Sequence, residues 1–239
     1  MRSHVTKPFL EGLRDGAPFV LVIVPFAMLF GVLAVEAGWD LAQTLGMSFI
    51  VIAGASQFTA LQLAKENAPL VVIVLTGLAV NLRMAMYSAS IAPHIGAAPL
   101  WQRALAAYFL VDQTYGTAIN RFTLQPRMSR PQKMAYFFGS AALVCPLWYV
   151  FTLVGALVGE TLPPALALDF AVPVTFIALF APALRSLPHL AAALVSATTA
   201  LAFAWMPYNL WMAAAAILAM ATGAGVEVWL ERRRARTAP

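Results

Sequence analysis

Long apolar stretches alternate with short polar breaks along the whole chain. Eight stretches are long enough to be α-helices that cross a bilayer, because a hydrocarbon core of roughly 30 Å takes about 20 residues. They cover residues 17–37, 41–64, 69–91, 101–120, 134–158, 166–184, 190–205 and 208–230. This pattern predicts an all-α, polytopic transmembrane bundle of about eight helices that forms a single domain over residues 1–239. The seventh stretch is short, so a seven-crossing bundle stays an alternative.

The composition agrees with burial in lipid. The chain is 62% hydrophobic and only 10% charged, whereas a soluble domain carries about 25% charged residues. A chain of this length cannot hide so much apolar surface from water in its own core. The first apolar stretch is too long for a signal-peptide core and is expected to remain in the mature protein. Cys145, the only cysteine, lies in an apolar run and is expected to be a buried thiol.

The basic residues indicate an orientation rather than a nucleic-acid partner. The net charge of +5 is spread over segment ends instead of forming one basic face. With eight crossings and both termini in the cytoplasm, almost every Lys and Arg outside the apolar stretches lies on the cytoplasmic side, as the positive-inside rule expects. On this count Lys65 lies inside and Arg103 is the one exception outside.

Two apolar stretches begin alike and predict proline breaks. Asp15 and Pro18 precede or open the first, which contains Pro25, while Asp169 and Pro173 lie near the start of the sixth. Helices interrupted at matching places are typical of transporters built from inverted repeats. We therefore expect helix breaks at Pro25 and Pro173 and a degenerate inverted repeat. The alternative is that these prolines only reflect the general frequency of proline in membrane helices.

Arg83 and Asp112 are the charges placed deepest in the apolar stretches. A charge at the centre of a membrane helix costs at least about 2.5–3.5 kcal/mol, so both need a polar environment. With a rise of 1.5 Å per residue their depths differ by roughly 8 Å, which a guanidinium arm can span. The pair, with its neighbours Asn81 and Gln113, either pins two helices together or faces a polar cavity on the path of a solute.

Gly54, Ser56 and Gln57 form a second polar cluster inside an apolar stretch. Small and hydroxyl-bearing residues let helices pack closely in a membrane. Alternatively, a break in the helix here frees backbone groups that can hold the charged ends of a zwitterion.

The sequence offers no constellation for catalysis. Gly-x-Ser-x-Gly, His-Glu-x-x-His, phosphate-loop and Cys/His patterns are all absent. His4, His94 and His189 fall in predicted termini or loops. We therefore expect no enzymatic activity, no catalytic residues, no metal site and no cofactor.

Four motifs together resemble a known family. They are residues 9–18 (FLEGLRDGAP), 54–58 (GASQF), 81–83 (NLR) followed by Asp112, and 169–173 (DFAVP). In this order they are similar to the AzlC/YgaZ family, the large subunits of bacterial branched-chain amino acid exporters. The resemblance implies a multi-pass protein of the bacterial inner membrane that exports valine, leucine or isoleucine, with methionine as a related substrate. It also implies a small membrane subunit of the AzlD/YgaH type as partner.

The chain departs from the family pattern at two positions. Met84 stands where the family often has His, and Gln113 stands where it often has Glu. Both changes remove a titratable group, so proton coupling and substrate identity are not carried over. In the amino acid hypothesis Arg83 meets the substrate carboxylate and Asp112 its ammonium group, beside apolar side chains such as Phe26 and Phe58. The alternatives are a facilitator or importer of another small solute, or a membrane assembly subunit that transports nothing.

Overall fold

The computed structural model describes residues 3–161, 184, 186–206 and 210–237. Every regular element in these residues is a helix, which confirms the all-α class. Contacts divide the chain into two compact units, Met1–Asp169 and Phe170–Pro239, and each is described by itself. Among the described residues, four helices are long and apolar enough to cross a membrane: Val5–Glu36, Leu70–Ile95, Arg130–Gly159 and Ala214–Arg233.

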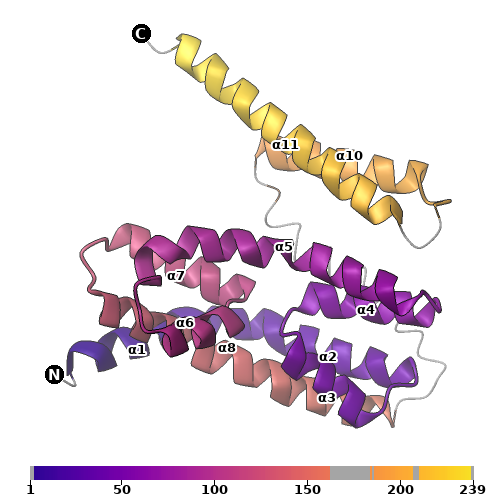
Figure 1. The fold of residues 1–239 in the computed structure, drawn as a ribbon, viewed down its shortest axis with the longest axis horizontal. Coiled ribbons are helices and arrows are strands. Elements are labelled where there is room, and N and C mark those ends of the chain that lie inside the picture. Colours follow the sequence, from indigo (N-terminus) through magenta and orange to yellow (C-terminus); the bar gives the residue numbers. More distant parts are fainter. Residues whose placement is uncertain (1–2, 162–183, 185, 207–209, 238–239) are drawn as a thin grey trace. The chain divides into compact units, whose positions relative to one another are not determined.

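The first unit is built on two long parallel helical rods (Figure 1). One rod joins α1 (Ser3–Gly16), the short 3-10 turn η1 (Ala17–Phe19) and α2 (Val20–Glu36), and the other is α8 (Arg130–Gly159). A Cβ atom on Gly12 would collide with the carbonyl oxygen of Tyr136, and one on Gly31 would collide with that of Thr152. The rods therefore touch backbone to backbone and run in the same direction. We call the end that holds α1 and the first turns of α8 the near end, and the opposite end the far end.

Pro25 does not break its helix. It lies inside α2, which continues from Val20 to Glu36, so the predicted break at this residue is wrong. A proline removes only its own hydrogen bond to the carbonyl four residues earlier, here Leu21, and membrane helices tolerate this loss. The irregular turn lies at η1 instead, where Pro18 occupies the first turn. Pro173 and the predicted helix over residues 166–184 lie almost entirely outside the described residues.

The predicted crossing over residues 41–64 is wrong, because this stretch forms a hairpin of two short helices. They are α3 (Leu41–Ile50) and α4 (Gly54–Lys65). α3 starts at the far end, where Asp40 accepts a hydrogen bond from the Gln43 backbone at 2.7 Å, and runs inward until Ser48 contacts Thr152. α4 then returns parallel to α2, since Gly54 lies beside Phe26 and Phe58 reaches Phe30. An uninterrupted apolar run of this length suits one crossing or two half-helices equally well, so hydropathy cannot distinguish them.

The predicted crossing over residues 101–120 is also wrong, for the same reason. It forms α6 (Leu100–Tyr108) and α7 (Asp112–Leu124), separated by residues 109–111. α6 starts at the near end, where Arg130 donates to the carbonyl of Ala97 at 3.0 Å. α7 returns to that end, since its Phe122 ring lies 5.3 Å from the ring of His94. Thr114 replaces lost backbone bonds at the break by accepting from the Val111 N–H at 2.9 Å and donating to the Phe109 carbonyl at 2.7 Å.

Both hairpins return the chain to the end from which it entered, so α5 (Leu70–Ile95) runs opposite to α2 and α8. This reverses two predicted sides. Arg103 lies at the near end with most other basic residues of the first unit, and Lys65 lies at the far end, which is the opposite of the prediction made from single crossings. The basic residues of the near half are Lys7, Arg14, Arg103, Arg121, Arg127, Arg130 and Lys133. The cytoplasmic position of the termini stays a prediction.

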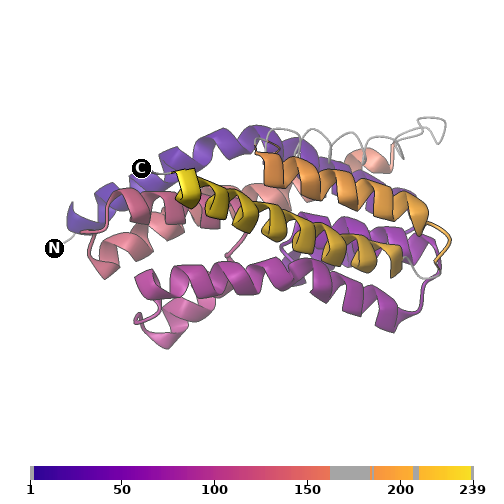
Figure 2. The ribbon, with the colours of Figure 1, turned by 90° about the horizontal axis from the view of Figure 1, so that it is seen from above.

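The second unit is a helical hairpin in its described part. α10 (Leu187–Ala202) and α11 (Leu210–Thr237) lie side by side in both views (Figures 1 and 2). Gly223 of α11 lets the helices approach, because a Cβ atom there would lie 3.3 Å from the Cβ of Ala192. These helices match the predicted stretches over residues 190–205 and 208–230 to within a few residues, except that α11 continues to Thr237.

Candidate functional site

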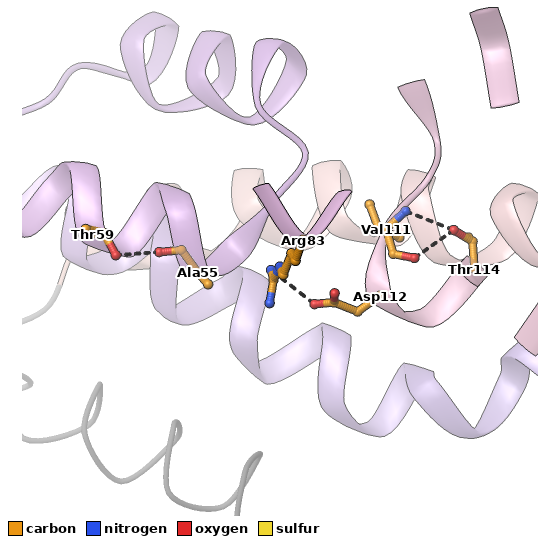
Figure 3. A network of polar contacts seen from close by, with 6 residues as sticks. All are labelled: Ala55, Thr59, Arg83, Val111, Asp112 and Thr114. Carbon is orange, nitrogen blue, oxygen red and sulfur yellow. Dashed lines mark hydrogen bonds and ion pairs between the residues drawn. The ribbon is translucent and has the colours of Figure 1, made fainter. Parts of the chain in front are cut away.

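Arg83 and Asp112 meet in the middle of the first unit. The Arg83 Nη2 and Asp112 Oδ2 atoms are 3.1 Å apart, which confirms the predicted pairing (Figure 3). Arg83 is the fourteenth of the 26 residues of α5, so it lies roughly 20 Å from either end of that helix. Asp112 is the first residue of α7, directly after the break in the α6–α7 hairpin. The pair thus joins the middle of a long helix to the start of a half-helix.

The pair is monodentate and leaves hydrogen-bonding capacity unused. Arg83 Nε and Asp112 Oδ1 are both buried and have no partner among the described residues, and the same holds for Asn81 Oδ1. The two side chains as a whole are 24% and 40% exposed. An unpaired buried polar atom costs free energy comparable to a lost hydrogen bond. A ligand that carries both an acceptor and a donor could satisfy Arg83 Nε and Asp112 Oδ1 together.

A pair of aromatic side chains lies one turn from these charges. Tyr87 follows Arg83 by four residues in α5, and Tyr115 follows Asp112 by three in α7. Their rings stack with centroids 4.1 Å apart, and the Tyr115 hydroxyl donates to Ser90 Oγ at 3.0 Å. Neither tyrosine was predicted from the sequence, although spacings of three and four residues place side chains on one face of a helix.

Ser56 and Gln57 hold the α3–α4 hairpin against its neighbours. Gln57 is completely buried and donates through Nε2 to Ser48 Oγ at 2.9 Å, and Ser48 in turn lies 3.5 Å from Thr152 Oγ1. Ser56 donates to the carbonyl of Gly77 in α5 at 3.2 Å. These contacts favour the helix-packing interpretation of the cluster. Gln57 Oε1 has no partner among the described residues. Ser48 and Thr152 were not predicted, because isolated hydroxyls in apolar helices carry no sequence signal.

Gly54 allows close packing at the start of α4. A Cβ atom there would lie 2.5 Å from Phe26 Cε1 and 2.8 Å from Trp148 Cη2. The Phe26 and Phe58 rings pack together with centroids 4.8 Å apart. These aromatic side chains therefore pack against one another rather than lining open space. The helix is broken before Gly54 and is tightly packed there, whereas the binding of a zwitterion at this break stays a prediction.

The tips of the two hairpins meet near this region. The Tyr108 hydroxyl, at the end of α6, donates to the carbonyl of Phe49 in the last turn of α3 at 2.6 Å. It also lies 2.9 Å from the Tyr149 hydroxyl of α8. Both α4 and α7 begin at these central tips, so the partial positive charges of two helix N-termini lie inside the unit. Half-helices that begin inside a membrane protein are typical of transporter binding sites.

The described residues show how the other predicted positions lie. Asn81 belongs to α5 and Gln113 to the first turn of α7, so both are close in sequence to the Arg83–Asp112 pair. The Gln113 carbonyl accepts a hydrogen bond from Thr117 Oγ1 at 2.5 Å. In the described part of the chain, no three His, Cys, Asp or Glu side chains come close enough together to hold a metal ion.

Comparison with known proteins gives the family. The family described as "AzlC protein" matches residues 18–162, which is more than half of the chain. The "Inner membrane protein YgaZ" of Escherichia coli strain K12 is 29% identical over 174 residues, covering 70% of each chain. An "Uncharacterized membrane protein" of Helicobacter pylori strain 26695 is 29% identical over 177 residues, covering 72% of this chain and 75% of its own.

A further relative is archaeal. An "Uncharacterized membrane protein" of Archaeoglobus fulgidus is 28% identical over 206 residues, covering 82% of this chain and 84% of its own. No solved structure matches the chain. Together with the apolar helices of membrane-spanning length, the matches agree with the membrane location. The chain therefore belongs to the AzlC family, as a multi-pass protein of the inner membrane with a role in membrane transport.

Proposed function

We propose that this chain is the large subunit of a secondary transporter that exports branched-chain amino acids from the bacterial cytoplasm. Valine, leucine and isoleucine are the proposed substrates, with methionine as a related one. The observation that carries the proposal is the unused donor and acceptor of the central ion pair, Arg83 Nε and Asp112 Oδ1. A free amino acid carries one carboxylate and one ammonium group, which match these two atoms in charge and in hydrogen bonding.

The electrostatics of the site support a zwitterionic substrate. Arg83 supplies a fixed cation for the carboxylate, and Asp112 supplies an anion for the ammonium group. Because the two protein charges cancel each other in the empty site, a substrate whose own charges also cancel adds no net charge to the middle of the membrane. The Tyr87–Tyr115 stack next to the pair offers an apolar surface to a branched side chain.

The partner and the absence of catalysis are parts of the same proposal. The resemblance to branched-chain amino acid exporters supports a small membrane subunit of the AzlD/YgaH type that assembles with this chain. Transport without chemical change is proposed because Asp112, the deepest carboxylate of the predicted segments, is engaged in an ion pair with Arg83. The chain is thus proposed to act as a transporter and not as an enzyme.

Arg83 and Asp112 variants test the proposal. Membrane vesicles are loaded with labelled isoleucine, and efflux is followed with and without the suspected small subunit. Arg83→Lys and Asp112→Asn each remove charge-assisted hydrogen bonds, a loss of about 1.5–3 kcal/mol, so we expect efflux to fall by about 10- to 100-fold. Arg103→Lys, which exchanges one cation for another near the start of α6, and Glu160→Gln, which removes a carboxylate at the end of α8, are the matched controls and should leave efflux unchanged.

Two results would contradict the proposal. Full efflux in both site variants, at equal amounts of protein in the membrane, would remove the assignment of Arg83 and Asp112. Equal efflux from vesicles with and without the chain would favour the alternatives, a carrier of another solute or an assembly subunit. The partial exposure of Asp112 favours transport over assembly, since a pair that only joins helices gains nothing from exposure.

A further inference from the structure

A second network of charged residues lies at the other end of α7. Arg121, in the last turn of α7, forms an ion pair with Glu11 of α1 through Nη2 and Oε2. The Arg121 guanidinium carbon also lies 5.4 Å from the centre of the Tyr136 ring in α8. The Tyr136 hydroxyl donates to Asp15 Oδ2 at 2.6 Å. Glu11 and Asp15 belong to the opening motif of the chain, whose role the central site does not explain.

Glu11 and Asp15 of α1 and Tyr136 of α8 lie on a rigid frame, the name we use for the packed pair of helical rods. Gly12 of α1 abuts the Tyr136 backbone, and Gly139 of α8 abuts the Phe9 backbone, so closely that neither position has room for a Cβ atom. Tyr136 itself is only 1% exposed. Two helices in backbone contact form one packed body. Arg121 is therefore attached to a fixed support and not to another movable element.

The position of Arg121 determines that of Asp112. Nine residues separate them in α7, so the two ends of this half-helix are about 13 Å apart along a stiff axis. At its start α7 follows a break in the backbone at residues 109–111, and at its end Leu124 is followed by the connection to α8. The contact between Arg121 and Glu11 thus fixes the end of a rod whose other end carries half of the central ion pair.

We propose that Glu11 and Arg121 are positioning residues for the central site, and that their ion pair holds α7 so that Asp112 faces Arg83. The inference rests on the proposed function for its link to transport, although the contact itself can be tested separately. The pair lines a hollow of about 780 Å³ together with Lys7, Gln125 and Arg127. Because the pair borders open space, with 23% and 30% of its side chains exposed, it can part without unpacking α1 from α8.

A charge exchange tests the positioning role. Glu11→Gln and Arg121→Gln should each lower isoleucine efflux about tenfold, the size expected for one coupled contact. The double variant Glu11→Arg with Arg121→Glu restores opposite charges and should recover most of the loss. Arg127→Gln, which changes a residue of the same hollow without an ion pair among the described residues, is the matched control and should leave efflux unchanged.

A labelling measurement separates this inference from the proposed function. Gly116 lies one turn after Asp112, and a Cβ atom added to it would have no neighbouring atom within 4 Å, so Gly116→Cys fits without strain. Its reaction with a water-soluble maleimide should become at least about threefold faster when Glu11→Gln releases α7, and return towards the original rate in the charge-exchanged variant. The chain without Gly116→Cys gives the background of the buried Cys145.

Each outcome either supports or overturns the positioning role of Glu11 and Arg121. Faster labelling with rescue by charge exchange supports the positioning role even if no amino acid efflux is detected, in which case only the proposed function fails. Unchanged labelling in Glu11→Gln and Arg121→Gln, or a charge-exchanged variant no better than the single ones, overturns the inference. Thermal unfolding in detergent shows whether a variant has lost efflux simply because it no longer folds.

Discussion

The two helical hairpins of the first unit share a shape but differ in chemistry. Each consists of two short helices around a three-residue break, at residues 51–53 in α3–α4 and residues 109–111 in α6–α7. They enter from opposite ends, and their tips meet through Tyr108 and Phe49. The α3–α4 hairpin presents neutral amide and hydroxyl groups to the interior, whereas the α6–α7 hairpin carries Asp112 at its tip and Arg121 near its base.

Burial follows the same division. Ser48 and Gln57 of the first hairpin are fully buried, and the hydrogen bond between them lowers the cost of burying these neutral groups. The charged side chains of the second hairpin and their partners retain 23–40% exposure, because removing water from an ion costs several kcal/mol. The difference indicates that α3–α4 belongs to the fixed frame and that α6–α7 carries the contacts a charged ligand can exchange.

The largest effect should come from a carboxylate placed in the α3–α4 hairpin, whose interior groups are neutral. Gln57→Glu puts an ionisable group where the side chain is fully buried and no cation is paired with it among the described residues. We expect a loss of about 3 kcal/mol or more in the free energy of unfolding, from desolvation of the charge or from its forced protonation. Thermal unfolding in detergent measures the loss.

Gln113→Glu is the matched control in the second hairpin. Gln113 lies in the first turn of α7 and is half-buried, where the helix N-terminus favours a negative charge by about 0.3–1 kcal/mol. The unfolding temperature of the Gln113→Glu variant should therefore stay close to that of the parent chain. If both glutamates proved equally harmless, the interior of the α3–α4 hairpin would have to be wetter than its packing indicates.

A glycine exchange in each hairpin should have an intermediate effect. Gly54→Ala forces a methyl group to within 2.5 Å of Phe26 and 2.8 Å of Trp148, and overpacking of this kind costs about 1–3 kcal/mol. Gly116→Ala adds a methyl group in open space inside a helix, where alanine is favoured over glycine by about 0.5–1 kcal/mol. The two variants should shift the unfolding temperature in opposite directions, and shifts of the same sign would contradict the contrast in packing.

The sequence predicted the chemistry of the centre better than its topology. Arg83 and Asp112 could be identified because a deep charge is costly whatever the fold, and the pair forms as expected at 3.1 Å. The hairpins could not be identified, since residues 51–53 are Val, Ile and Ala and residues 109–111 are Phe, Leu and Val. No glycine, proline or charge lies in either break, and an apolar turn inside a membrane looks the same as continuous helix in a hydropathy pattern.

The contacts at the C-terminal end of α7 were not predicted, for a related reason. Glu11 and Asp15 lie near a segment end, where exposure to water is the simplest explanation for a charge. Their partners Arg121 and Tyr136 lie more than 100 residues away in the chain, and such contacts depend on the direction of each helix. Because α5, α6 and α7 were assigned wrong directions or lengths, the sequence could not bring these residues together. The one available signal was the spacing of four residues between Glu11 and Asp15, which places the two carboxylates on one face of a helix.

The smallest effect should come from the contact between the two tips. Phe49 lies in the last turn of α3, where backbone carbonyls lack helical partners, and Tyr108 donates to its carbonyl at 2.6 Å. Tyr108→Phe removes this bond and the one to Tyr149, so we expect a loss of about 1 kcal/mol, the usual net value of a hydrogen bond. Tyr149→Phe removes only the contact between the hydroxyls and leaves the carbonyl paired.

Comparing the unfolding temperatures of these two variants shows which contact stabilises the tips of the hairpins. If the bond across the tips stabilises the hairpins, Tyr108→Phe must lower the unfolding temperature more than Tyr149→Phe. The double variant should then be no worse than Tyr108→Phe alone, because the contact between the two hydroxyls is lost in both. A larger effect of Tyr149→Phe would mean that α8, rather than the opposite hairpin, anchors α6. In that case the α6–α7 hairpin would be held to the frame at its tip as well as at Arg121, and the contrast between a fixed and an exchangeable hairpin would no longer hold.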